Sequence, residues 1–172
     1  MRTLTRFIAV AALLVGCVGC DQVTKTAART HLSDGPTITF LHDTVRLTYA
    51  ENVGAFLSLG ESLPKQARAA LFQGGVGLIV LALVGAALFW RGLARFEIAA
   101  LALLGASGLG NLIDRLLYDG RVTDFLNLGI GQVRTGVFNV ADVVGVLGVI
   151  VLLVLRSVAS PPNKRMQRSG SP

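Results

Sequence analysis

Apolar residues in this sequence gather into four long blocks, and polar stretches separate them. The blocks cover residues 7–20, 71–90, 98–113 and 137–155. A bilayer core about 30 Å thick needs roughly 20 helical residues, and about 17 at the least. The second and fourth blocks reach this length directly, and the first and third reach it with one further turn in the membrane interface. The pattern predicts four transmembrane helices over approximately residues 5–23, 69–90, 96–115 and 137–156.

The polar stretches carry strand signals of their own. Residues 37–41 and 44–49 are rich in β-branched and aromatic residues and flank His42-Asp43, which predicts a hairpin on the membrane surface. Residues 121–128 and 131–137 have the same character. Residues 52–59 form an amphipathic patch, which favours a short surface helix. The expected fold is an all-α membrane bundle of four transmembrane helices with a small β-cradle and a short surface helix at one end.

The composition agrees with a single membrane domain. Hydrophobic residues make up 52% of the chain and charged residues only 15%, whereas a soluble domain would spread its apolar residues along amphipathic elements. We expect one four-helix membrane domain over residues 1–159 of the 172. Residues 160–172 contain Pro161-Pro162 with several serines and basic residues, which predicts a disordered basic tail on the cytoplasmic side.

The net charge of +6 is concentrated on one side of the predicted bundle. Residues 21–68 hold five acidic and five basic residues, and residues 114–134 hold three of each, so both stretches are neutral. The remaining basic residues are Arg2, Arg6, Arg91, Arg95, Arg156, Lys164, Arg165 and Arg168. Because cytoplasmic loops carry the excess of Lys and Arg, both termini are expected in the cytoplasm. No basic patch is left for nucleic acid, and no such partner is expected.

The first helix has a second interpretation. Basic residues precede its apolar block, and Leu14-Val15-Gly16-Cys17 looks like a lipoprotein cleavage site, which would make the segment a removable signal peptide. We favour a retained helix, because the polar motif that begins at Asp21 makes more sense when it is joined to one. Cys17 and Cys20 lie one turn apart in an apolar helix without further ligands, so neither a redox nor a zinc role is expected.

Ionisable residues at membrane depth are costly, which makes them functional candidates. Asp142 lies about one turn inside the fourth predicted helix, and Asn139 shares its face. The alternative is that Asp142 only caps the helix or bonds to a neighbour. Asp124, in a strand-like run, would by itself be interpreted as a surface or turn residue. Its position eighteen residues before Asp142, at the same membrane face, makes it a candidate as well.

Two carboxylates at a low-dielectric interface do not both ionise cheaply, so such a pair holds a shared proton near neutral pH. A dyad of this kind can take a proton from water and give one to a carbonyl oxygen, which peptide hydrolysis requires. It needs neither metal nor cofactor, and we expect none. Ser107 has no histidine placed to activate it, so a Ser/His triad has no support. His31 and His42 are expected to be ordinary surface residues.

Further polar pairs lie at the same level. Asn111 and Arg115 are four residues apart near the end of the third predicted helix, and Asp21 and Lys25 stand in the same relation at the end of the first. Hydrogen bonds and ion pairs between helices are common structural contacts in membrane bundles, and for Asp21 and Lys25 we favour such a role. The run Gly105-Ala106-Ser107-Gly108 is interpreted as a close-packing surface rather than a ligand loop.

With these residues in view, nearly the whole chain resembles lipoprotein signal peptidase (signal peptidase II). The stretches that carry the resemblance occur in the family's order and are Asp21-Gln22-Val23-Thr24-Lys25, Asn52-Val53-Gly54-Ala55-Phe56, Gly110-Asn111-Leu112-Ile113-Asp114-Arg115, Val122-Thr123-Asp124-Phe125 and Phe138-Asn139-Val140-Ala141-Asp142. One departure is that Phe56 follows Ala55 directly, where many members have a further small residue. This affects the expected surface helix and not the carboxylates.

The resemblance implies a membrane aspartic endopeptidase of the bacterial inner membrane, with its active site near the periplasmic face. Its substrate would be a diacylglyceryl-modified prolipoprotein, cut on the amino side of the lipidated cysteine, with the signal peptide entering from the lipid. It implies that Asp124 and Asp142 form the catalytic dyad. Residues that hold substrate or shape the site would be Asn52, Gly54, Asn111, Arg115, Asn139 and Ala141, and the supporting residues would be Asp21, Lys25 and Asp114. The enzyme is expected to act as a monomer among membrane lipids.

Two other classes of protein remain open. A small carrier or channel subunit could relay protons through intramembrane acids. It would need acids through the depth of the bilayer, whereas those in this sequence stop near one surface. A secreted lipoprotein processed at Cys17 would leave the three later apolar blocks without a membrane to occupy.

Overall fold

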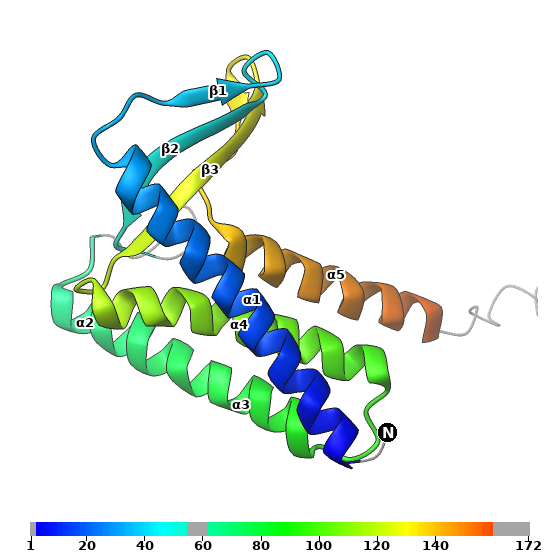
Figure 1. Ribbon diagram of the computed structural model, residues 1–172. Coiled ribbons are helices and arrows are strands. Elements are labelled where there is room, and N and C mark those ends of the chain that lie inside the picture. The colour runs from blue at the N-terminus through cyan, green and yellow to red at the C-terminus, as the bar shows by residue number, and fades with distance from the viewer. Residues whose placement is uncertain (1–2, 55–61, 160–172) are drawn as a thin grey trace, which may run out of the picture.

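The computed structural model describes residues 3–54 and 62–159, with side chains up to residue 157. It is a bundle of helices with a small sheet at one end (Figure 1). The helices are α1 (Thr3–Leu32), α2 (Lys65–Ala69), η2 (Ala70–Gly75), α3 (Val76–Phe89), α4 (Arg95–Leu117) and α5 (Val140–Ala159). The strands are β1 (Ile38–Phe40), β2 (Val45–Asn52), β3 (Val122–Ile130) and β4 (Val133–Arg134). Most of the predicted surface helix at residues 52–59, and all of the predicted tail at residues 160–172, lie outside the described residues.

Within the described residues, four helical spans are long and apolar enough to cross a membrane, which confirms the four predicted ones. They cover Thr3–Leu32, Lys65–Phe89, Arg95–Leu117 and Val140–Ser157. Large apolar side chains such as Leu78, Leu81 and Val154 are exposed on the outer faces of these spans. The hydrocarbon core of a bilayer would cover such faces. The fold is therefore a four-helix membrane bundle with a small antiparallel sheet.

The helix α4 lies at the centre of the bundle, between α3 and α5, and α1 packs across it (Figure 1). Glycines on α4 allow α3 to approach closely. A Cβ at Gly105 would lie 2.8 Å from Cγ2 of Val84, and one at Gly108 would lie 2.6 Å from Cγ2 of Val80. Small residues at such positions are the common way for membrane helices to pack. The close-packing role predicted for this glycine run is confirmed.

The first helix is longer than predicted, because α1 ends at Leu32 and not near residue 23. The charged residues that suggested an end to the span instead continue the helix. Lys25 is fully buried, and its Nζ lies 2.8 Å from Oδ2 of Asp21 and 3.6 Å from Oδ2 of Asp114 on α4. Protein contacts thus replace water around these charges. The helix also runs without a break through Cys17, so the stretch that looks like a cleavage site is part of a packed helix.

The bounds of the other spans differ less. The second span starts at Lys65 rather than residue 69, and it contains a π-helical stretch, η2, immediately before α3. Such wider turns are often found at functional sites, and Phe72 within it turns inward and is buried. The third helix, α4, agrees with its prediction within two residues at each end. The fourth helix, α5, begins at Val140 rather than residue 137.

The late start of α5 has a clear physical cause. Phe138 is held in extended form against β3, because its backbone N–H donates to the Leu126 carbonyl at 2.8 Å and its carbonyl accepts from the Leu126 N–H at 2.8 Å. A residue bonded in this way cannot also contribute to the first helical turn. The chain can turn into a helix only after Phe138, and this brings the start of α5 directly beside β3.

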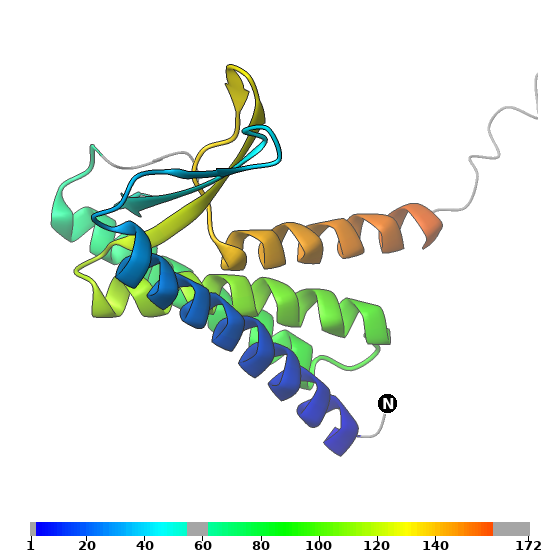
Figure 2. The same cartoon turned by 45° about the horizontal axis from the view of Figure 1, so that its top comes forward.

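As expected, the predicted strand regions join into one small antiparallel sheet, and its strand order is β1-β2-β3-β4. Its long central pair is β2 and β3, with Ala50 opposite Asp124 and Asn52 opposite Val122. The predicted hairpin is confirmed, whereas β4 has two residues instead of the predicted segment 131–137. Figure 2 shows the sheet at the end of the bundle where α1 ends and α5 begins. The register therefore brings the ends of β2 and β3 to the first turn of α5.

Candidate active site

Asp124 and Asp142 come from different elements, and Asn139 connects them. Asp124 lies on β3 and Asp142 is the third residue of α5. The side chain of Asn139 donates from Nδ2 to Oδ1 of Asp124 at 2.7 Å, and its backbone N–H donates to Oδ2 of Asp142 at 3.1 Å. The sequence placed the two carboxylates at one membrane face, and the structure brings both of them to a single asparagine.

The contact between Asn139 and Asp142 is a reciprocal cap on α5. Asn139 precedes the helix, and its Oδ1 accepts from the backbone N–H of Asp142 at 3.1 Å, while the Asp142 carboxylate accepts from the Asn139 N–H. This is the geometry of a capping box, in which each side chain satisfies the other residue's backbone donor. Asp142 therefore does take part in a helix cap, and the same contact holds its carboxylate in place beside Asn139.

Asp124 is 3% exposed and accepts a second hydrogen bond from Nδ2 of Asn52 at 3.2 Å. Burial, with the nearby charge of Asp142 as the second cause, raises the pKa of its carboxyl group from 3.8 to about 6. The hydrogen bonds from Asn52 and Asn139 oppose this shift. Asp124 thus keeps its proton to a higher pH than an ordinary aspartic acid does.

Asn111 of α4 binds Asp142, the other member of the pair. Its Nδ2 donates to Oδ1 of Asp142 at 3.0 Å. Its Oδ1 accepts from Nζ of Lys25 at 2.8 Å and from Nδ2 of Asn139 at 3.0 Å. Because two donors point at the amide oxygen, the amide nitrogen must face Asp142. Lys25 thereby fixes the orientation of the group that binds Asp142.

Arg115 ties the end of β2 to α4. Its Nη2 donates to the carbonyl oxygen of Gly54 at 2.7 Å, and its guanidinium lies 5.5 Å from the centre of the Phe72 ring. The backbone N–H of Gly54 in turn donates to Oδ1 of Asn52 at 2.9 Å. This leaves Nδ2 of Asn52 directed at Asp124. The predicted site residues Asn52, Gly54 and Arg115 therefore form one connected wall.

A buried ionic cluster of Asp21, Lys25 and Asp114 connects the elements that carry the site. Asp21 accepts from the backbone N–H of Ala141 at 2.8 Å, which ties α1 to the first turn of α5. Asp114 accepts from the backbone N–H of Thr123 at 2.9 Å, directly before the Asp124 position on β3. Lys25 lies between these two carboxylates. The structural role favoured for Asp21 and Lys25 is consistent with these contacts.

Sequence reasoning did not single out two members of this cluster. Gln22 donates from Nε2 to Oδ1 of Asp114 at 3.1 Å and to the Gly110 carbonyl at 3.0 Å. Arg29 pairs with Asp114 at 2.8 Å and donates to Oγ1 of Thr123 at 2.8 Å. Arg29 follows Lys25 by four residues, so the same helical spacing that linked Asp21 to Lys25 could have identified it.

The dyad opens into a cavity of about 630 Å³. The cavity is polar near the sheet, where Asn52, Asn111 and Arg115 contribute to its wall, and apolar along the helices. Much of its apolar lining comes from α3, α4 and α5 and includes Val76, Gly108, Val143, Val146 and Leu147. The site can therefore receive an extended peptide bond next to two carboxylates, together with an apolar segment along the membrane-spanning helices.

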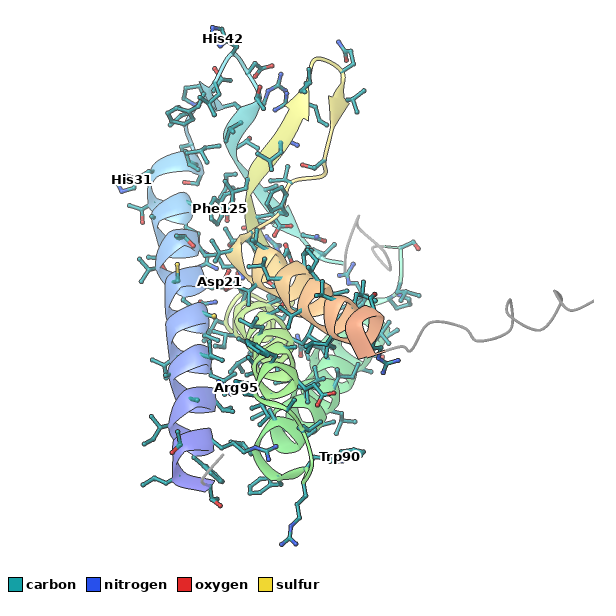
Figure 3. All side chains as sticks on the ribbon, turned by 90° about the vertical axis from the view of Figure 1, so that its right-hand side faces the viewer. Asp21, His31, His42, Trp90, Arg95 and Phe125 are labelled. Carbon is teal, nitrogen blue, oxygen red and sulfur yellow. The ribbon has the colours of Figure 1, made fainter. Side chains whose placement is uncertain are left out.

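The two histidines lie away from this site. Figure 3 shows His42 at the tip of the sheet and His31 on the outer side of α1, and both residues are exposed. Within the described ranges, no three His, Cys, Asp or Glu side chains gather in a way that could hold a metal ion. The absence of a metal from the chemistry stays a prediction, which the chelator experiment below tests.

Comparisons with known proteins identify the family of this chain. Residues 13–158 match the family described as signal peptidase (SPase) II. The chain is 39% identical over 152 residues to a lipoprotein signal peptidase of Sphingopyxis alaskensis, covering 86% of this chain and 80% of the relative. It is 30% identical over 160 residues to one from Bifidobacterium adolescentis, covering 90% and 79%. A solved bacterial membrane enzyme aligns with a TM-score of 0.75 at 29% identity, over 88% of this chain and 94% of that one. The chain therefore belongs to the signal peptidase II family and is a membrane peptidase.

Proposed function

We propose that this peptidase is an aspartic endopeptidase that removes signal peptides from diacylglyceryl-modified prolipoproteins by cutting on the amino side of the lipidated cysteine. The observation that carries the proposal is the pair Asp124 and Asp142, joined by Asn139, at the polar end of an otherwise apolar cavity. Relatives that bear the name lipoprotein signal peptidase support the substrate class.

The proposed reaction uses one ionised and one protonated carboxyl group. Asp142 accepts two N–H donors at the start of α5, which suits the ionised form. It takes a proton from a water molecule, whose oxygen attacks the carbonyl carbon of the scissile bond. Asp124, with its pKa raised to about 6, gives its proton to the carbonyl oxygen. When the C–N bond breaks, the leaving nitrogen receives the proton that Asp142 had taken. The former carbonyl oxygen returns its proton to Asp124 as the C=O bond re-forms, so both carboxyl groups regain their starting states, and no metal or cofactor takes part.

The surrounding residues hold the substrate and shape the site. Asn111 and Asn139 keep the carboxylates in place through the amide contacts described above. Arg115 and Asn52 form the wall nearest the sheet, with Gly54 between them. Ala141 is tied through its backbone to Asp21, and this fixes the first turn of α5. Asp114 and Lys25 support this arrangement from α4 and α1.

The apolar part of the cavity is the proposed route for the signal peptide. Val146 and Leu147 of α5 line it and are also 57% and 49% exposed, so the cavity continues into the face that lipid would cover. A hydrophobic signal helix could pass from the bilayer into this groove without crossing water. Its scissile bond would then lie beside the dyad, and the diacylglyceryl chains could stay in the lipid.

We further infer that the enzyme lies in the inner membrane with both termini in the cytoplasm, acts as a monomer and has its site and surface helix at the periplasmic face. The start of α1, the link from α3 to α4 and the end of α5 lie together at the end opposite the sheet (Figure 1). The basic residues Arg91, Arg95 and Arg156 belong to these segments. This distribution supports the orientation that the positive-inside rule predicts.

The proposal is tested by incubating the purified enzyme in detergent with a prolipoprotein that carries the diacylglyceryl group and with the same protein lacking it. Mass spectrometry of the products then locates the cut bond. We expect one cut, directly before the cysteine, and only in the lipidated substrate. Cleavage elsewhere, or equal cleavage of the unlipidated protein, would contradict the substrate assignment.

A further inference from the structure

Arg134 of β4 lines the cavity from the sheet side, yet it belongs to none of the contacts that hold the dyad. Its side chain is 13% exposed. Two of its nitrogens are engaged: Nε donates to Oδ1 of Asn127 at 2.6 Å, and Nη1 donates to the Asp43 carbonyl oxygen at 2.8 Å. These contacts fix the plane of the guanidinium group.

The third nitrogen, Nη2, is buried and has no hydrogen-bond partner among the described residues. An unpaired buried donor on a charged group is costly, so a small shift of the guanidinium group that brings Nη2 to an acceptor in the adjoining cavity would be favourable. The charge is also incompletely balanced, because Asp43 lies 3.5 Å from Nη1 but makes its shorter ion pair, at 2.6 Å, with Arg46. An anionic oxygen in the cavity would satisfy both the donor and the charge.

The backbone is built to keep this side chain in place. Gly129 pairs with Arg134 across the β3–β4 hairpin, and a Cβ at Gly129 would lie 2.5 Å from Cγ of Arg134. The missing side chain gives the arginine stem room to pass over the strand. The following residue is held as well, since Thr135 bonds to Leu128 through both its backbone N–H, at 2.7 Å, and its hydroxyl, at 3.0 Å.

The position of Arg134 indicates which part of the substrate it meets. The apolar lining that faces the lipid lies on α5, with more on α3 and α4, whereas Arg134 enters from β4. If the signal peptide occupies the apolar part, as the proposed function requires, the chain beyond the scissile bond leaves toward the sheet. We propose that Nη2 of Arg134 binds an acceptor oxygen of the residue that follows the lipidated cysteine, and that it favours substrates with an acidic residue there. This inference rests on the proposed function.

The test compares two lipidated substrates that differ only in having Asp or Ala directly after the cysteine. For the wild type we expect a KM roughly tenfold lower for the Asp substrate, with similar kcat, since a hydrogen bond between charged groups is typically worth this much. Arg134→Met removes the donor and is expected to abolish the preference. Arg134→Lys keeps a charge and is expected to retain part of it. Equal KM values for both substrates with the wild type would overturn the proposal.

A matched variant separates recognition from support of the hairpin. Asp43→Ala removes the carboxylate beside Arg134 but keeps the carbonyl and leaves Nη2 in place, so we expect the preference to persist. If Asp43→Ala abolishes it as fully as Arg134→Met does, the role of Arg134 is structural. A substrate with ether-linked chains tests the lipid ester carbonyl as the acceptor. One outcome would overturn the proposal by assigning the bound oxygen to the lipid ester. In that outcome, Arg134→Met raises KM equally for the Asp and Ala substrates, and it has no effect on KM when the chains are ether-linked.

Binding distinguishes failure of this inference from failure of the proposed function. The affinity of fluorescent Asp and Ala lipopeptides for the Asp142→Asn enzyme is measured with and without Arg134→Met. An Arg134-dependent preference in binding supports the inference even where no cleavage occurs. Cleavage by the wild type without any such preference leaves the proposed function standing and removes the role of Arg134.

Discussion

The buried lysine of α1 offers a sharp test of how the bundle supports its site. Lys25 is fully buried, and its Nζ contacts Oδ2 of Asp21 at 2.8 Å, Oδ2 of Asp114 at 3.6 Å and Oδ1 of Asn111 at 2.8 Å. Lys25→Met keeps the length of the side chain and removes the charge. Asp114 would still have Arg29, but Asp21 would lose the only cation that pairs with it among the described residues.

Breaking a buried ion pair by removing one partner costs about 3–5 kcal/mol, because the remaining charge is left without compensation. Since the total stability of a protein is roughly 5–15 kcal/mol, this loss should be large in any unfolding measurement. The double variant Lys25→Met/Asp21→Asn removes the leftover charge, while the amide oxygen can still accept from Ala141. We expect it to recover about 1–3 kcal/mol of the loss, as coupled neighbours do.

The assay is unfolding in mixed detergent micelles followed by circular dichroism, together with cleavage by each variant. Lys65→Met is the matched control, since its ion pair with Asp119 is largely exposed and its loss should leave the unfolding midpoint near that of the wild type. Both Lys25 variants should also cleave more slowly, because Asn111 loses a donor that orients its amide. A single variant as stable as the wild type, or a double variant no better than the single one, would refute this reasoning.

Three further predictions follow from the site. The proton on Asp124 is lost as pH rises through about 6, so kcat/KM should fall above this pH. Asn52→Ala should move the fall to higher pH, because it removes a hydrogen bond that lowers the pKa of Asp124. An unchanged pH profile in that variant argues against Asp124 as the proton donor. Gly110→Ala would place a Cβ 2.7 Å from Oδ2 of Asp21 and should cost about 1–3 kcal/mol and most activity, whereas Gly85→Ala, with nothing within 4 Å, should be tolerated, and equal thermal midpoints would contradict this. Treatment with EDTA should leave the cleavage rate unchanged, and loss that added metal restores would count against a metal-free dyad.

The four spans could be predicted from the sequence because their signal is local. Each is an apolar run long enough to cross a bilayer, and the structure agrees closely for α4. The end of α1 could not be predicted in this way. Lys25 and Arg29 resemble the polar end of a span, and they can stay within the packed helix because Asp114 on α4 lies beside both of them. A hydrophobicity pattern read along one segment does not include a partner that lies far away in the sequence.

At the site, too, the sequence predicted some features and not others. The sequence indicated Asp124 and Asp142 as a pair, because both are acidic residues and both were predicted at the same membrane face. It did not indicate that Asn139 would bridge them, since this depends on the extended Phe138, whose backbone pairs with Leu126 on β3. Arg134 was likewise not a candidate, because only the fold brings it into the lining of the cavity.

The most direct test of the account is single-turnover cleavage of a diacylglyceryl-modified prolipoprotein by the wild type, Asp124→Asn and Asp142→Asn. Asp34→Asn, at an exposed position beyond α1, is the matched control. Unfolding midpoints measured in parallel confirm that each variant is folded. We predict full cleavage by the wild type and by Asp34→Asn, and none by either dyad variant. Normal cleavage by a folded Asp124→Asn or Asp142→Asn enzyme would contradict the central claim.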